Sequence, residues 1–462
     1  MRVFNRWQSD KLKAALEISW LLTVFFCFLG SAVFLIKIPG IPVLYPFRVL
    51  LPVTALLYLI WIIRERRNPW KEATFIQRAS YVLCVILAVY STLSLGRAID
   101  RSFTAPLWIT LCFDLVFFAL VLELCSDRTM FTRTSWCALA ALGIQIVLGI
   151  KEVFFRTTFT HRKSNRNFAF FGKLHRPPIV AASNTNDYVM GLVFTLALLL
   201  LFWAWKGRKG KYAWLPVVLL APVYFLICSA GSRLCTLAFW MLMLGAILYM
   251  LTMDKKKWWI PVVAVLLVGF VIYGCNSNPE VKRVSMTMSE TPGQTLYLQD
   301  QSLKEEIFKT DSETGEVKLN VTMSGGVRIS LLLHALDCFL QSKGMGVGLG
   351  NTAQLAKVTA AQRDGTWAIH CFLARMTADF GIWFLIPLLV VAGAMLWQGL
   401  RFVVVEKKNR RWTNVMTGIL YLLTVIVFPI ASTASGDAQN SLPMWLFLGY
   451  LAVYPKYLRD IE

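Results

Sequence analysis

The sequence carries little charge for its length. Charged residues make up 16% of its 462 residues, whereas 57% are hydrophobic. A water-soluble protein of this composition would aggregate, so the sequence favours a polytopic membrane protein over a soluble enzyme. Acidic residues are scarce, since 26 Asp and Glu stand against 47 Lys and Arg, for a net charge of +21. In a membrane protein this excess reflects cytosolic loops and anionic lipid, so nucleic acid is not an expected partner.

Several other features are absent. The ten cysteines have no paired spacing that would hold a metal ion, and most lie in apolar runs where they act as small hydrophobic residues. We therefore expect neither a metal nor a cofactor. Internal repeats and low-complexity tracts are also missing, which weighs against transporters built from repeated halves. Residues 1–13 are polar and basic, and the apolar run that follows is long enough to span a bilayer, so we expect no cleavable signal peptide.

Long apolar runs dominate what remains. They predict an all-α fold, a polytopic transmembrane helical bundle of about 12 spans. Lys and Arg clusters at residues 64–78, 206–211 and 407–411 mark the cytosolic ends and place both termini in the cytosol. The predicted spans are residues 15–36, 43–63, 80–95, 106–124, 136–154, 188–205, 214–230, 234–253, 259–273, 380–400, 415–431 and 443–454.

A long polar interruption divides the chain into three parts. Residues 1–273 carry spans one to nine, and residues 372–462 carry spans ten to twelve. Residues 274–371 are too long and too hydrophilic for a simple connector, so we expect an extracytoplasmic loop that contains short helices. A second loop, at residues 156–178, is strongly basic although it falls on the outer side, and it includes Arg162 and Arg166. It either gathers an anionic ligand or is a solvated, headgroup-binding loop.

Arginines near the outer ends of two predicted helices are candidate phosphate ligands. Arg233 follows Gly231 and Ser232 beside the start of span eight. An arginine near hydrocarbon is costly unless it finds a partner or water, so it either snorkels to headgroups or faces a phosphate. Arg328 opens an apparent helix and is either a second phosphate ligand or a solvated residue. The apolar face of that helix predicts that it lies on the membrane or on the bundle; its residues are Ile329, Leu332, Leu333, Leu336 and Leu340.

A glycine-rich turn and a histidine complete the pattern. Residues 344–351 place glycines at alternate positions, including Gly348 and Gly350, and end in Asn351. The spacing does not fit a dinucleotide fingerprint. The turn either presents backbone N–H groups to an anion or is a plain flexible connection. His370 could accept a proton from a hydroxyl group, bind a pyrophosphate oxygen, or hold the interface together.

Taken together, these motifs resemble one family. A Gly-Ser-Arg arginine after a span, an outer loop with Arg…GxGLGN, and a histidine followed by Asp-Phe-Gly-Ile are similar to the O-antigen ligases and Wzy-type polysaccharide polymerases, whose architecture resembles GT-C enzymes. The Asn184–Asp187 stretch, with Asn186, is similar to the Asn-x-Asn segment of that family. Cys371 departs from the pattern, because the family often has asparagine after its histidine.

The resemblance implies a membrane glycosyltransferase with its site on the extracytoplasmic face of a bacterial cell membrane. It would move a glycan from an undecaprenyl-pyrophosphate-linked oligosaccharide to an acceptor hydroxyl, and polymerisation of repeat units is favoured. A ligase and a lipid-linked glycan flippase are the alternatives, and a chain-length regulator and a flippase are possible partners. Arg233 and Arg328 would hold the pyrophosphate and His370 would be essential. The expected substrate contacts are Asn186, Ser232, Gly348, Gly350, Asn351, Arg162 and Arg166.

Overall fold

The computed structural model describes most of the chain. The described residues are 2–29, 45–155, 167–171, 173–175, 185–206, 214–252, 258–276, 308–310, 317–319, 324–359, 369, 371–435 and 441–459. Arg162, Arg166 and His370 lie outside them, as do the side chain of Arg328 and the end of the first predicted span.

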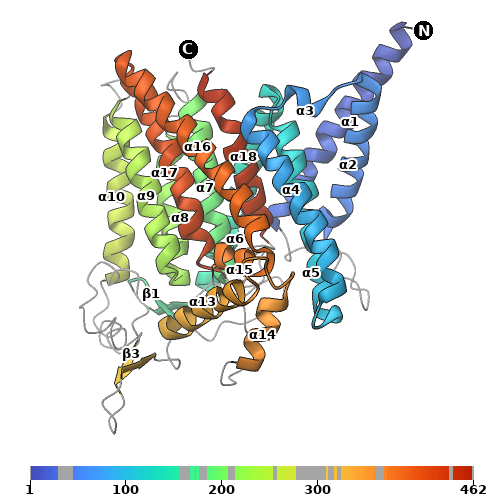
Figure 1. Ribbon diagram of the computed structural model, residues 1–462. Helices are drawn as coiled ribbons and strands as arrows, with labels where there is room; N and C mark the ends of the chain where they lie inside the picture. The colour runs from blue at the N-terminus through green and yellow to red at the C-terminus, as the bar shows by residue number, and fades with distance from the viewer. Residues whose placement is uncertain are drawn as a thin grey trace.

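The fold is an all-α polytopic bundle, as predicted (Figure 1). Within the described ranges nine helices are long and apolar enough to cross a membrane, and α8, α10 and α18 complete the bundle. The helices are α1 (Arg2–Leu29), α2 (Pro46–Glu65), α3 (Pro69–Glu72), α4 (Phe75–Ser94), η2 (Leu95–Arg97), α5 (Arg101–Leu124), α6 (Arg128–Phe155), α7 (Thr185–Lys206), α8 (Leu215–Ala230), α9 (Arg233–Leu251), α10 (Trp259–Asn276), α13 (Ser324–Gln341), α14 (Asn351–Thr359), α15 (Phe372–Phe380), α16 (Ile382–Lys408), α17 (Trp412–Ser432) and α18 (Leu442–Arg459).

Within the described residues, each predicted span falls on one of the bundle helices, but several helices start earlier than the apolar run. α5 begins at Arg101 because Asp100 caps it, accepting hydrogen bonds from the backbone N–H groups of Ser102 and Phe103. Asp127 accepts in the same way from the first turn of α6. The first-turn N–H groups of a helix have no acceptor within the helix, and lipid hydrocarbon offers none. Because the two aspartates supply acceptors, the helices can begin before the apolar run.

Two short antiparallel hairpins interrupt the helices. β1 (Asn167–Ala169) pairs with β2 (Lys173–His175), so that Asn167 lies opposite His175. β3 (Phe308–Thr310) pairs with β4 (Val317–Leu319), with Phe308 opposite Leu319.

The bundle is organised around α7. Every residue from Asp187 to Trp205 is buried, and α6, α8, α9, α17 and α18 pack around this helix. A helix that is apolar on all sides belongs in the centre of a bundle. The first turn of α7 is polar, however, and it lies at the end of the bundle near α13 and α15.

The two ends of the bundle differ. The start of α1 and the end of α18 lie together with α3 at one end, and α13 and α14 lie at the other (Figure 1). At this second end α13, α14 and α15 share a small core of their own. Its buried members are Leu331, Ala335, Cys338, Ala356, Ile369 and Ala378.

Candidate functional site

α15 joins the small core to the bundle. Ala378 faces the small core, whereas Phe372, Met376 and Phe380 are buried in the main core. The ring of Phe372 lies about 6 Å, centroid to centroid, from those of Phe384, Phe428 and Trp445, at 6.0, 5.9 and 6.2 Å. α15 is therefore packed between the main core and the small core. It begins at Phe372, two residues after position 370.

Asp379, near the end of α15, anchors the glycine-rich turn. Its carboxylate accepts hydrogen bonds from the N–H of Gly350 at 3.0 Å, the N–H of Thr352 at 3.2 Å and the hydroxyl of Thr352 at 2.5 Å. Burial raises the pKa of Asp379 above its ordinary range, while Arg375, one turn earlier, and these hydrogen bonds offset part of that rise. Arg375 is itself only 4% exposed, so two ionisable side chains of α15 are buried under the turn.

The turn itself lies directly against the end of α15. Val347 and Gly348 donate their N–H groups to the carbonyl oxygens of Ala378 and Asp379, both at 2.9 Å. A Cβ atom on Gly346 would come within 2.6 Å of the Asp379 carbonyl oxygen. Gly346 also has a φ of 84°, a conformation that favours glycine. The close backbone contact and the positive φ thus explain why position 346 requires glycine.

The other side of the turn is bound to the connection between α4 and α5. The side-chain amide of Asn351 donates to the carbonyl of Arg97 at 3.1 Å, and its oxygen accepts from the N–H of Ile99 at 3.1 Å. The Leu349 N–H donates to the hydroxyl of Ser94 at 3.3 Å. The turn is therefore a clamp between α15 and the bundle.

This arrangement corrects one part of the sequence analysis. The glycine N–H groups of the turn donate within the protein. That of Gly346 donates to the Ser342 hydroxyl, that of Gly348 to the Asp379 carbonyl oxygen, and that of Gly350 to the Asp379 carboxylate. In this conformation they are not presented to an anion. Direct contact between substrate and Gly348, Gly350 or Asn351 stays a prediction, and the geometry gives these residues a clamping role.

A second group of polar residues surrounds the start of α9. Gly231, with a φ of 69°, is the residue after α8, and Ser232 is the residue before α9. This tight connection places Arg233 in the first turn of α9 at the same end as the clamp. Ser232 is buried, and Cys235, one turn on, interacts with Ser232 and with Asp187 of α7.

Asp187 connects this group to the end of α17. The hydroxyl of Ser435 donates to its carboxylate, and Asn186 precedes it in the first turn of α7. Two residues before Ser435, the hydroxyl of Thr433 donates to the Cys371 sulfur at 3.7 Å. Hydrogen bonds thus join the start of α7 and the residue before α15 to the residues that follow α17, and α9 packs on α7.

The structure brings several predicted residues to one end of the bundle. Asn186 lies in the first turn of α7, Ser232 directly precedes α9, and Arg233 is the first residue of α9. The residues on either side of position 370 are fixed, since Ile369 is 1% exposed in the small core and Cys371 contacts Thr433. The backbone of Arg328 lies in the second turn of α13, which packs on α15.

The structure adds three polar residues to the site, namely Asp187, Arg375 and Asp379. The sequence holds one usable signal for two of them. In the segment Ala374-Arg-Met-Thr-Ala-Asp379, arginine and aspartate are four residues apart, which puts both on one face of a helix. The contact between Asp187 and Ser435 has no such signal, because it joins residues 248 positions apart.

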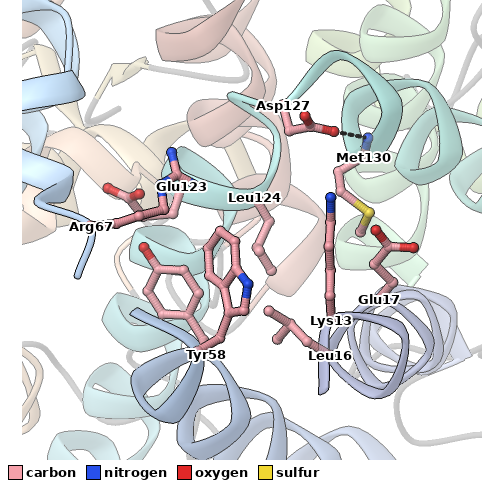
Figure 2. Close-up of a pocket in the computed structure, with 10 residues that line it drawn as sticks. Lys13, Leu16, Glu17, Tyr58, Arg67, Glu123, Leu124, Asp127 and Met130 are labelled. Carbon is pink, nitrogen blue, oxygen red and sulfur yellow. Dashed lines mark hydrogen bonds between the residues drawn. The ribbon is translucent and has the colours of Figure 1, made fainter. Parts of the chain in front are cut away.

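A pocket at the opposite end of the bundle does not belong to this site. It lies between α1, α2, α5 and α6 (Figure 2). Two of its charged groups form ion pairs: Glu17 pairs with Arg133, and Arg67 pairs with Glu72. Asp127 accepts a hydrogen bond from the Met130 N–H at 2.9 Å, the dashed line in Figure 2. These contacts indicate a structural junction.

Comparison with known proteins gives one weak relationship. No protein-family model matches the chain. The chain is similar to the teichuronic acid biosynthesis protein TuaE of Bacillus subtilis (strain 168), with 26% identity over 137 residues. The aligned part spans 29% of this chain and 28% of TuaE. The chain is thus loosely related to a protein of cell-surface polysaccharide biosynthesis.

Proposed function

We propose that this protein is a membrane glycosyltransferase of surface polysaccharide assembly. It would use a glycan carried on a polyprenyl pyrophosphate, of which undecaprenyl pyrophosphate is the expected form, and it would extend a polymer of repeat units. The observation that supports this most is the convergence at one end of the bundle. There the start of α7, which carries Asn186, and Cys371 before α15 are hydrogen-bonded to the residues after α17, and α9, which begins at Arg233, packs on α7.

The proposed chemistry needs positive charge at the leaving group. The acceptor hydroxyl oxygen attacks the anomeric carbon, and the bond from that carbon to the pyrophosphate oxygen breaks. The electron pair leaves on the pyrophosphate, where Arg233 and Arg328 would stabilise it. Guanidinium groups match phosphate oxygens in pairs and form strong, charge-assisted hydrogen bonds. His370 would take the proton of the attacking hydroxyl.

The clamp has a positioning role in this proposal. The Asp379 carboxylate and Asn351 hold the glycine-rich turn between α15 and the α4–α5 connection. Because α13, which carries Arg328, packs on α15, the clamp fixes the small core against the bundle that carries Arg233. Two arginines from distant parts of the sequence are then kept at one end of the molecule, as a preorganised charge-stabilising site requires.

The similarity to TuaE supports the substrate class. TuaE is a protein of teichuronic acid biosynthesis, and an acidic polymer would suit the basic loop at residues 156–178, including Arg162 and Arg166. We place the site on the extracytoplasmic side and the chain termini in the cytosol. The Lys and Arg clusters near the α2, α7 and α16 ends support this orientation.

The test is extension of a defined lipid-linked repeat by the purified protein in nanodiscs. We expect a ladder of products from the wild type, and a loss of about 10²- to 10³-fold in rate for Arg233→Ala, the usual effect of removing one transition-state donor. Arg64→Lys, at the exposed opposite end, is the matched control and should keep full activity. A single transfer without a ladder would identify a ligase. No transfer by the wild type, or full activity in Arg233→Ala, would refute the proposed function.

A further inference from the structure

α13 has two apolar faces, and only one of them packs on the protein. Leu331, Ala335 and Cys338 face the small core and are 5%, 2% and 4% exposed. The neighbouring face is a stripe of leucines that points away from the protein. Its members are Leu332, Leu333, Leu336 and Leu340, which are 45%, 50%, 52% and 62% exposed. The stripe that the sequence analysis placed on the membrane or on the bundle therefore does not make the bundle contact.

The two edges of this stripe differ in polarity. Phe339 lies on the edge between the two apolar faces, and its ring is 3.5 Å from where a Cβ on Gly344 would stand. The Gly344 carbonyl accepts the Ile382 N–H at 2.8 Å, so this edge adjoins the start of α16. The opposite edge is polar, with Ser330, Asp337 and Gln341, and Gln341 donates to Asp337 at 2.7 Å.

The leucine stripe continues the exposed apolar surface of α16. Trp383, Ile386 and Leu389 on this membrane-spanning helix are 41%, 56% and 59% exposed. Met345, 46% exposed, lies between the end of α13 and the start of α16. α13 lies across the end of the bundle (Figure 1), whereas α16 runs along it. Apolar surface on a spanning helix faces acyl chains, and a tryptophan near its start is typical of the membrane interface.

We propose that α13 is an interfacial helix whose leucine stripe inserts into the lipid leaflet at this end of the bundle. A helix with one apolar and one polar side lies in the plane of the interface, its apolar side about 5–10 Å into the boundary between headgroups and acyl chains. The lipid leaflet is the occupant because the apolar edge of α13 meets the lipid-facing surface of α16 and its polar edge lies opposite. If the proposed function also holds, α13 keeps Arg328 near the depth of lipid phosphates.

The first test maps lipid contact on the unmodified protein. The full chain is reconstituted in phosphatidylethanolamine–phosphatidylglycerol nanodiscs that contain a lipid with a diazirine in its acyl chain, and labelled residues are identified by peptide mass spectrometry. We expect label on Leu332, Leu336 and Leu340, and on Ile386 of α16 as the internal positive control. Label on α16 with none on α13 would overturn the proposal.

The second test compares two positions one residue apart. Nitroxides are attached at Leu336→Cys and Asp337→Cys, and wild-type protein treated in the same way supplies the background from natural cysteines. We expect the label at 336 to be several-fold more accessible to oxygen relative to a water-soluble nickel chelate than the label at 337. Equal access of the chelate to both would place the stripe in water. Protection of 336 from both agents would mean a second copy or a protein partner, and either result refutes lipid insertion.

Both measurements report position and not turnover. Loss of transfer activity in the assay with lipid-linked repeats would leave them unchanged, and failure of lipid insertion would leave the chemistry assigned to Arg233 and His370 intact. The two proposals can therefore fail separately.

Discussion

Removing the Asp379 carboxylate should open the glycine-rich turn. In Asp379→Ala, the N–H groups of Gly350 and Thr352 and the Thr352 hydroxyl lose the acceptor that the structure gives them. The buried Arg375, one helical turn earlier, also loses a nearby carboxylate. A buried donor without its partner costs about 1–3 kcal/mol, and three such donors lose their acceptor here.

These costs overlap, because water can enter the space that the side chain leaves. We expect a local destabilisation of about 3–5 kcal/mol for Asp379→Ala, or roughly a 140- to 4,000-fold larger population of the open turn, since about 1.4 kcal/mol is a factor of ten. Asp379→Asn keeps the shape and one acceptor oxygen but turns an amide donor toward other donors. It should cost about 1–2 kcal/mol, roughly tenfold.

Hydrogen exchange of the amides in residues 344–356, followed by mass spectrometry in detergent or nanodiscs, measures this opening. Asp337→Asn is the matched control, because Asp337 is exposed on α13 and accepts only from the Gln341 side chain among the hydrogen bonds described. That control should leave exchange of the turn within about twofold, as surface substitutions change stability little. Unchanged exchange in Asp379→Ala would show that the contacts of Asn351 and Ser94 hold the turn without the carboxylate.

Three further predictions concern the charged residues. Arg328→Lys should express normally yet lose most polymer, because an ammonium cannot present paired donors to a phosphate; normal polymer on a gel would contradict the role of the guanidinium. His370→Ala should accumulate lipid-linked single repeat units, detected by lipid extraction and chromatography, and full-length chains in that variant would remove its assigned role. Because burial raises the Asp379 pKa in the folded state, the folded state binds this proton more tightly, so the stability of the turn should fall as the pH rises above about 4. Amide hydrogen exchange of residues 344–356, corrected for its intrinsic pH dependence, measures this loss of stability with rising pH. Asp379→Asn should abolish the loss.

The membrane-spanning helices could be predicted from the sequence because their signal is local. An apolar run of sufficient length must cross the bilayer as a helix, since only a helix satisfies its backbone groups there. The separation of α15 from α16 was missed, and span ten was predicted to begin near residue 380. Gly381, with a φ of 64°, divides the two helices. A Cβ at that position would lie 2.2 Å from the Gly344 carbonyl oxygen, so the break is set by a contact with the distant glycine-rich turn.

The face of α13 shows a different limit. The spacing of its leucines correctly predicts a helix with an apolar stripe, but periodicity cannot show which of two apolar faces meets the protein. Leu331, Ala335 and Cys338 form the contact because small side chains at 335 and 338 allow α15 to approach closely. The bulkier leucines of the predicted stripe remain outside.

The candidate site lies where two separately packed parts of the molecule meet, and this explains why its parts are so scattered in the sequence. Ile369 belongs to the small core, and Cys371 both packs against that core and accepts a hydrogen bond from Thr433, the residue after α17, so Cys371 contacts both parts. Asp187, whose contact with Ser435 continues that connection, begins the fully buried central helix. A charge placed at such a junction can be held by both parts while remaining outside the hydrocarbon. The two arginines are divided between these parts. Arg233 begins α9 in the bundle, and Arg328 lies on α13, which packs against α15. A pyrophosphate bound there would connect the small core to the bundle, so the clamp at Asp379 and the charge of the two arginines should stabilise the same assembled state.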